Sequence, residues 1–204
     1  MKKGFFITIE GCEGSGKTTQ IKMLKEFFEK QKIDGVFTKE PGGTVFGEKL
    51  REILKHADFE ICAIAELLLF ESSRAEHMKE VVIPALNANK IVVCDRFVDS
   101  SIAYQGYGRG IDLAEIKQLN EIATFGVVPD LTIWLDICPK DAFERKNGMD
   151  SGDRIEEEGL AFHDKIYAGF KKICEENPKR VVRIDAKGSC EKVFKDIIKT
   201  INKK

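Results

Sequence analysis

The chain has 204 residues, of which 43% are hydrophobic and 33% charged, and its formal net charge is −1. This length suits one domain with a sizeable core. The balanced charge creates no overall field that would attract nucleic acid or an anionic membrane, and no apolar stretch approaches the ~20 residues of a membrane span. We therefore expect a globular protein without a nucleic-acid or membrane partner, in which any anion site is local.

The cysteines and histidines point to an ordinary reducing compartment. Six cysteines lie far apart without a C-x-x-C pair, and the three histidines have no partners at metal-ligand spacing. We expect reduced thiols, a cytoplasmic location and no structural metal.

Apolar, β-branched runs alternate with helical patterns along the whole chain. Strands are predicted at 5–10, 36–40, 91–95, 131–137 and 181–185. Helices are predicted at 17–32, 46–55, 61–87, 113–124, 139–146, 156–176 and 189–202. Nearly continuous apolar strands are typical of parallel strands covered on both faces, and their alternation with helices implies right-handed crossovers. The sequence therefore predicts an α/β fold with a three-layer, doubly wound, parallel five-stranded sheet.

The first predicted strand leads directly into a complete G-x-x-x-x-G-K-[ST] motif, which a predicted helix follows. This setting is what a phosphate-binding loop requires, because glycines let backbone N–H groups surround phosphate oxygens and the helix N-terminus adds partial positive charge. Lys17 can reach the β- and γ-phosphates, and the Thr18 hydroxyl can bind Mg²⁺. The motif predicts a P-loop NTPase. Its expected ATP-binding residues are Gly11, Cys12, Glu13, Gly14, Ser15, Gly16, Lys17, Thr18 and Thr19.

A second group of polar residues follows the third predicted strand. That strand ends in Asp95, as expected of a Mg²⁺-associated carboxylate beside a P-loop. An ATPase that uses water needs no further groups here, whereas an enzyme that holds a second organic phosphate and a base needs several. Arg96 can bind a phosphate with two parallel hydrogen bonds. The remaining candidates in this stretch are Ser100, Ser101, Tyr104 and Gln105.

Two shorter features agree with a second organic ligand. Glu40 and Pro41 begin a turn-forming loop at a predicted strand end, and Arg51 follows on the next helix. Phe70 and Arg74 lie one helical turn apart and share a face. An aromatic ring stacked on a base, with an arginine at the base edge, is one interpretation, although core packing also explains Phe70.

One segment has the composition of a mobile loop. Residues 146–153 contain two glycines and several small polar residues, between Arg145 and Arg154. This composition fits a lid at about 145–154, and it also fits a solvated connector.

Together these motifs resemble the thymidylate kinase family, which phosphorylates dTMP to dTDP with ATP and Mg²⁺ in dTTP biosynthesis. The resemblance covers nearly the whole chain, from the first strand to the last helix. It rests on the P-loop at 10–19, Glu-Pro-Gly-Gly-Thr at 40–44, the two motifs Asp-Arg-Phe at 95–97 and Ser-Ser-Ile-Ala-Tyr-Gln-Gly at 100–106, and Asp-Arg-Ile-Glu at 153–156. The resemblance implies a single kinase domain of the nucleoside monophosphate kinase type and a homodimer.

The resemblance also implies roles at the phosphate end of the acceptor nucleotide. Asp95 is similar to the catalytic carboxylate of the family and, with Thr18, is expected near Mg²⁺. Arg96 and Arg51 are expected to hold the dTMP phosphate. Glu13, inside the P-loop, resembles the acid that meets the 3′-hydroxyl side of the nucleotide.

At the base end, the resemblance implies that Phe70 stacks on thymine. Arg74, Ser101 and Gln105 are expected to hydrogen-bond its polar edge. Tyr104 resembles the residue beneath the deoxyribose, where it would disfavour a 2′-hydroxyl.

The family divides by whether its transition-state arginine lies in the P-loop or in the lid. Ser15 and its neighbours include no arginine, so the chain resembles the bacterial-type class in which the lid supplies the cation. The candidates are Arg145, Lys146 and Arg154.

Three alternatives remain open from the residues. Another nucleoside or deoxynucleoside monophosphate kinase, or a deoxynucleoside kinase, would keep the P-loop but change the base-contacting set. A GTPase switch would need an N-K-x-D motif, which Asn-Pro-Lys-Arg at 177–180 does not match. A pure ATP-binding regulatory module would have no reason to carry Arg51, Phe70, Arg74, Arg96 and Gln105 together. As a separate matter, the apolar helix around 63–70 can serve a dimer interface or simply the core.

Overall fold

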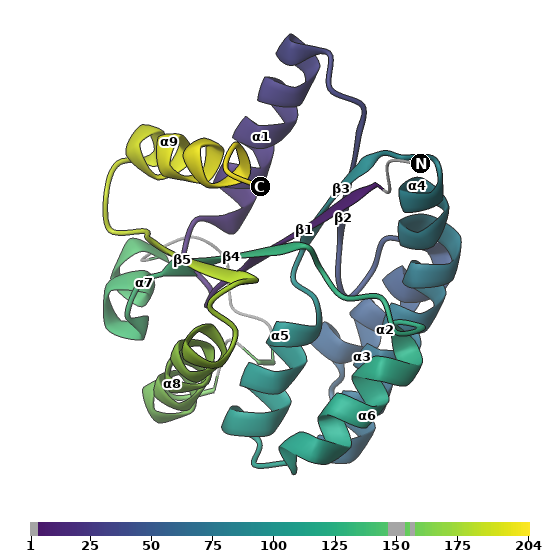
Figure 1. Cartoon of the computed structure of the whole chain (residues 1–204). Coiled ribbons are helices and arrows are strands. Elements are labelled where there is room, and N and C mark those ends of the chain that lie inside the picture. The colour runs from purple at the N-terminus through teal and green to yellow at the C-terminus, as the bar shows by residue number, and fades with distance from the viewer. Residues whose placement is uncertain (1–3, 147–153, 156–157) are drawn as a thin grey trace.

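The computed structural model describes residues 4–146, 154–155 and 158–204. These residues form a five-stranded sheet with the order β2-β3-β1-β4-β5, and every neighbouring pair is parallel (Figure 1). The strands are β1 (Phe5–Glu10), β2 (Gly35–Lys39), β3 (Ile91–Asp95), β4 (Leu131–Asp136) and β5 (Val181–Asp185). The predicted fold class is confirmed, and each predicted strand lies within one residue of the observed one.

Helices connect the strands and cover the sheet. They are α1 (Lys17–Gln31), α2 (Val45–His56), α3 (Ala63–His77), η1 (Met78–Val82), α4 (Ile83–Asn87), α5 (Val98–Ser101), η2 (Ile102–Gly108), α6 (Leu113–Ala123), α7 (Pro139–Lys146), α8 (Leu160–Glu176) and α9 (Cys190–Ile201). The elements η1 and η2 are π-helical. None of the helices in the described part of the chain has the length and apolar character needed to span a bilayer.

Three helix predictions need correction. The single helix predicted at 61–87 is divided by η1, which lies just before Pro84; proline has no N–H to continue the regular ladder. The helix predicted from 156 begins at Leu160, after the extended N-cap Gly159. The short α5–η2 pair was not predicted, because its polar motif does not show a clear helical period.

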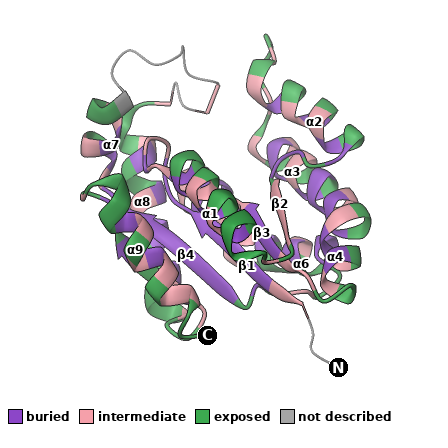
Figure 2. Cartoon of the chain, turned by 90° about the horizontal axis from the view of Figure 1, so that it is seen from above, coloured by how far each residue is buried: buried purple, intermediate pink, exposed green. Residues whose placement is uncertain are grey.

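Each face of the sheet has its own layer of helices. Ile7 and Ile9 of β1 pack in one apolar cluster with residues of α1 and α9. Phe6 packs on the other face, against η1 and α4. Side chains alternate along a strand, so Glu10 shares the face of Phe6. Figure 2 shows the largely buried strands β1 and β4 between helices whose outer surfaces are exposed, whereas edge strand β2 is of intermediate burial.

Adjacent strands bring separate loops to one edge of the sheet. The backbone N–H of Arg96, just after β3, donates to the backbone carbonyl of Ile9 at 3.0 Å. The backbone N–H of Glu40, just after β2, donates to the backbone carbonyl of Asp95 at 2.9 Å. The P-loop begins at the same edge, after β1. This is the carboxyl edge, where ligands bind in open parallel sheets.

A buried ion pair between Asp99 of α5 and Arg180 holds α5 against the sheet. Asp99 is 1% exposed and accepts hydrogen bonds from Arg180 at 2.6 and 2.8 Å. Thr132 of β4 donates to the same carboxylate at 3.1 Å and pairs with Thr8 of β1 at 2.7 Å. Because α5 begins just after Arg96, this network fixes the segment that carries the expected phosphate-binding arginine.

The segment expected to form a lid, 145–154, lies mostly outside the described residues. Its two flanking arginines, Arg145 and Arg154, are described. The side chain of Lys146 is outside the description, so that candidate has no structural assignment.

Candidate active site

A cavity of about 450 Å³ opens at the carboxyl edge of the sheet and brings most of the predicted site residues together. From the P-loop it is lined by Glu13, Gly14, Gly16, Lys17, Thr18 and Thr19. From the expected acceptor side it is lined by Glu40, Pro41, Arg51, Phe70, Arg74, Asp95, Arg96, Ser100, Ser101, Tyr104 and Gln105. Arg145 also lines it, whereas the described lining does not include Gly11, Cys12, Ser15 or Arg154.

The P-loop owes its shape to its glycines. Gly14 has a φ of 74°, and a Cβ there would lie only 2.4 Å from the carbonyl oxygen of Ala142, so no other residue fits. The ammonium of Lys17 folds back and donates to the carbonyls of Gly11 at 2.9 Å and Cys12 at 3.0 Å. The loop is therefore held in a concave form by the same lysine that the motif assigns to phosphate.

Arg96 occupies the junction between the P-loop and η2. It has a left-handed φ of 68°, which is uncommon for a residue other than glycine. Its Nη1 donates to Gly11 at 3.1 Å and to Ser100 at 3.3 Å, and its Nη2 pairs with the Glu13 carboxylate. The guanidinium lies 5.0 Å from the ring centroid of Tyr104. These contacts fix a cation at the cavity wall.

Glu10 supports this junction from behind the cavity, a role that the sequence analysis missed. Its carboxylate is fully buried and accepts hydrogen bonds from the Phe97 N–H at 2.8 Å and from the Ser100 hydroxyl at 2.6 Å. Burial, with Asp99 nearby, raises the pKa of Glu10 to about 7, although Ser100 and Arg96 favour its ionised form. The sequence signal for this role is that an acidic residue ends the first predicted strand, directly before the P-loop.

Arg74 is held rigidly at another wall of the cavity. It is 2% exposed, its Nε donates to Glu40 at 2.8 Å, and its Nη1 donates to Ser101 at 3.0 Å and Asn120 at 2.6 Å. Glu71 accepts from the same Nη1. Among the described residues Nη2 makes no hydrogen bond, so this nitrogen is available to a ligand in the cavity.

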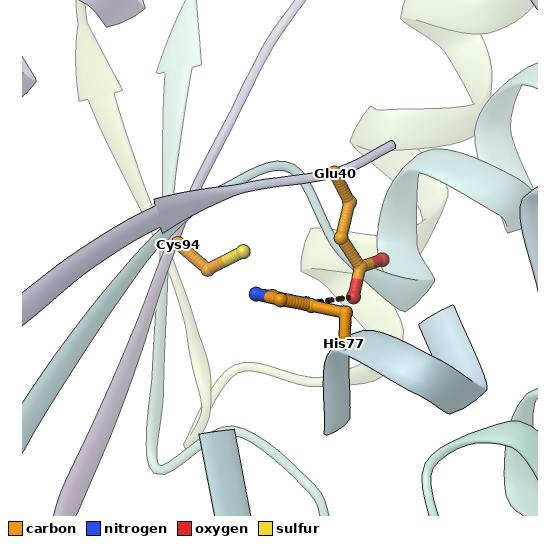
Figure 3. A group of neighbouring side chains, drawn as sticks. All are labelled: Glu40, His77 and Cys94. Atoms are coloured by element: carbon orange, nitrogen blue, oxygen red, sulfur yellow. Dashed lines mark hydrogen bonds and ion pairs between the residues drawn. The ribbon is translucent and has the colours of Figure 1, made fainter. Parts of the chain in front are cut away.

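Behind Arg74 lies a buried group of possible metal ligands, Glu40, His77 and Cys94, whose ligand atoms are within 4.8 Å of one another (Figure 3). A carboxylate only accepts, so His77 Nδ1 donates to Glu40 at 2.8 Å, and Nε2 forms a hydrogen bond with the Thr38 hydroxyl at 2.7 Å. Cys94 donates to the Arg96 carbonyl at 3.1 Å, and burial raises its pKa well above the usual value. These atoms already take part in hydrogen bonds. We therefore interpret the group as a hydrogen-bond network that orients Glu40, and not as a metal site.

The loop after β2 supports Arg51. The peptide bond between Glu40 and Pro41 is cis. Arg51 donates to the carbonyl of Pro41 at 3.0 Å. Thr44 caps α2 by accepting from the N–H of Gly47 at 2.9 Å. The loop is thus joined to α2 at two points, at its N-cap and at Arg51, which lines the cavity.

The two arginines that flank the expected lid differ in their positions. Arg145 lines the cavity and donates to the carbonyls of Ala186 at 2.7 Å and Lys187 at 2.9 Å. Arg154 instead pairs with buried Glu66 and donates to the carbonyl of Leu54 at 3.3 Å. In this structure only Arg145 is placed with the P-loop residues.

Five lining residues were not predicted from the sequence. Leu54 and Lys55 follow Arg51 by three and four positions on α2, so helical spacing could have identified them. Lys39 directly precedes Glu40, and Phe97 and Ile155 belong to the motifs at 95–97 and 153–156, but no role was expected for these three side chains.

The burial of Glu10 generates a test of this geometry. The folded state holds the Glu10 proton more tightly than the unfolded state does, so its stability contribution is complete below pH 4.5 and is lost as the pH rises through about 7. Relative to Glu10→Gln, the free energy of unfolding of the wild type should fall by about 3 kcal/mol between about pH 4 and about pH 8. Urea denaturation of both proteins measures this difference; parallel pH profiles would contradict it.

A family model, curated relatives and a solved structure all match this chain over most of its length. The family model described as thymidylate kinase matches residues 9–197. The chain is 50% identical to a thymidylate kinase of Synechococcus sp. (strain JA-3-3Ab) over 90% of this chain and 88% of that protein. It is 48% identical to one of Thermoanaerobacter sp. (strain X514) over 98% of each. The crystal structure of thymidylate kinase from Ehrlichia chaffeensis superposes with a TM-score of 0.78 and 35% identity, covering 98% of this chain and 99% of that one. The chain belongs to the thymidylate kinase family.

Proposed function

We propose that this protein transfers the γ-phosphoryl group of ATP to dTMP, giving ADP and dTDP. The observation that carries the proposal is the composition of one cavity. It contains a P-loop with Lys17 and, beyond it, the two arginines Arg51 and Arg96. A triphosphate on the P-loop and a monophosphate on the arginines would share this cavity, as direct phosphoryl transfer requires.

The wall around Arg74 supports thymine as the acceptor base. Phe70 offers a ring for stacking, and Arg74 and Gln105 offer hydrogen-bonding groups at the same wall. Thymine has a carbonyl at O4, which suits the available donor of Arg74, and an N–H at N3. Tyr104, whose ring lies against the Arg96 guanidinium, would fill the space that a ribose 2′-hydroxyl needs.

We propose that catalysis depends on positioning and charge. The dianionic phosphate of dTMP is already a nucleophile, so no strong base is required when it attacks the γ-phosphorus in line. Lys17 would leave the loop carbonyls for the phosphate oxygens of ATP, while Arg51 and Arg96 would hold the attacking phosphate. Glu13 would meet the sugar near its 3′-hydroxyl.

The residues at the cavity also fit Mg²⁺. Asp95 Oδ1 is buried and has no hydrogen-bond partner among the described residues, and Thr18 lines the same cavity. Oxygen ligands of this kind suit a hard divalent cation. Asp95 and Thr18 would hold the ion, which would neutralise charge on the phosphates.

The position of Arg145 favours it as the cation that neutralises the transferring group. Arg154 is paired with Glu66, and we propose for it a role outside the phosphate site.

We further propose that the chain is a single kinase domain, 1–204, with a mobile lid at about 145–154. A cytoplasmic location agrees with six cysteines that are all free thiols.

A homodimer is supported by exposed apolar side chains on two neighbouring helices, α3 and α6. α3 contacts both α2 and α6 (Figure 1). Ile64 and Leu68 of α3 are 48% and 46% exposed, and Ile122 of α6 is 72% exposed. Such side chains would gain from burial in a second copy.

Acceptor selectivity tests the function itself. We expect ADP release, measured by a coupled assay, to be fastest with dTMP and weak with dCMP, whose amino group and bare ring nitrogen reverse the hydrogen-bonding pattern. Thymidine should give no reaction, because it lacks the phosphate that Arg51 and Arg96 hold. Preference for dCMP would indicate another monophosphate kinase, and preference for thymidine a deoxynucleoside kinase; either result would contradict the proposal.

Arg96→Ala tests the phosphate site. The variant should lose about 10³-fold or more of its dTMP-dependent turnover, because the attacking phosphate of dTMP is no longer held in line and its charge is no longer neutralised. ATP affinity, measured by calorimetry, should remain largely intact. Arg183→Ala, which removes a half-exposed arginine outside the cavity lining, is the matched control. Near-normal turnover of Arg96→Ala would show that the role is wrongly assigned.

Leu68→Glu tests the dimer. Light scattering should give the mass of two chains of 23.0 kDa for the wild type and of one for the variant, because a charge would be buried unpaired. Leu160→Glu alters a leucine of similar exposure on α8 and should stay dimeric. A monomeric wild type would refute the dimer.

A further inference from the structure

Glu66 of α3 is a buried acid that joins three segments. It is 1% exposed and is not part of the cavity lining among the described residues. Its Oε1 accepts from Gln105 Nε2 at 3.0 Å and from Arg109 Nε at 3.2 Å. Its Oε2 accepts from Arg109 Nη2 at 3.2 Å and from Arg154. Four donors therefore fill the acceptor positions of one carboxylate.

These contacts keep Glu66 ionised. Burial alone would raise the pKa of Glu66, but hydrogen bonds from Arg109, Gln105 and Arg154 outweigh it and hold the pKa below the usual value. Arg109 is fixed in turn by Glu158 and by the ring of Phe162, whose centroid lies 4.6 Å away. Glu66 is thus a permanent acceptor with no proton to donate.

A permanent acceptor fixes the orientation of the Gln105 amide. Because Glu66 cannot donate, the NH₂ group of Gln105 must face it, and the carbonyl Oε1 must point elsewhere. Gln105 is 2% exposed and lines the cavity. The group that it can offer a ligand is therefore an acceptor, in the same cavity that Arg74 lines.

We propose that Glu66 is a positioning residue that sets the hydrogen-bonding polarity of Gln105 and so favours thymine over cytosine. An acceptor at Gln105 suits the N3–H of thymine and opposes the bare N3 of cytosine. The inference rests on the proposed contact between Gln105 and the base. Arg154 binds the same carboxylate, and its backbone N–H donates to the carbonyl of Lys55 on α2 at 3.3 Å. The carboxylate that orients Gln105 therefore also holds residue 154 against α2.

Glu66→Gln is the direct test. A glutamine at 66 can donate or accept, so the Gln105 amide is free to turn over. The ratio of kcat/KM for dTMP to kcat/KM for dCMP should fall about tenfold, with the KM for dTMP raised and the KM for ATP unchanged. A purely structural role would lower both activities together and leave the ratio as in the wild type.

Two further variants complete the experiment. Glu158→Gln removes the other acid that binds Arg109 but leaves Glu66 in place, and should keep the wild-type ratio. Glu66→Asp keeps a negative charge for both arginines but shortens the reach to Gln105, and should also lower the ratio. It provides a second test if Glu66→Gln does not fold.

The outcomes separate this inference from the proposed function. If the wild type prefers dTMP and a folded Glu66→Gln or Glu66→Asp keeps the same ratio, the positioning role of Glu66 is wrong. If the wild type does not distinguish dTMP from dCMP, the base-contacting role of Gln105 is itself wrong, and this inference fails with it.

Discussion

The parallel pairing of β1 with β3 is the constraint on which the site depends. It aligns Ile9 with Asp95, so that the P-loop after β1 and the arginine after β3 emerge together. Glu10 at the end of β1 then accepts hydrogen bonds from Phe97 and Ser100, which stabilises the turn at Arg96. Two segments more than eighty residues apart are in this way fixed within hydrogen-bonding distance of each other.

A recurring device in this structure is an arginine held by a glutamate from within the protein. Arg74 is fixed by Glu40, Arg154 by Glu66, and Arg96 by Glu13 and, through Ser100, by Glu10. A long side chain that is already fixed loses little freedom when an anion arrives, and a preorganised cation needs no reorganisation during the reaction. Of these arginines, Arg96 is the one to which we assign a phosphate; Arg74 is assigned to the base, and Arg154 does not line the cavity among the described residues.

The strands and the P-loop could be predicted because their signals are local. An apolar β-branched run that ends in G-x-x-x-x-G-K-T specifies strand, loop and helix within thirty residues. The division of the long helix also has a local signal, Pro84, although the helical period by itself predicts a single helix over 61–87. By contrast, the importance of Glu66 depends on donors from η2 and from residue 154, which no periodicity connects.

The central claim is that two phosphorylated nucleotides share the cavity, with the acceptor base against Phe70 and Arg74. A crystal structure of the complex with dTMP tests it most directly. The account predicts the thymine ring on Phe70, its O4 within hydrogen-bonding distance of Arg74, and the phosphate between Arg51 and Arg96. Density for dTMP at any other place, with this wall empty, would contradict it.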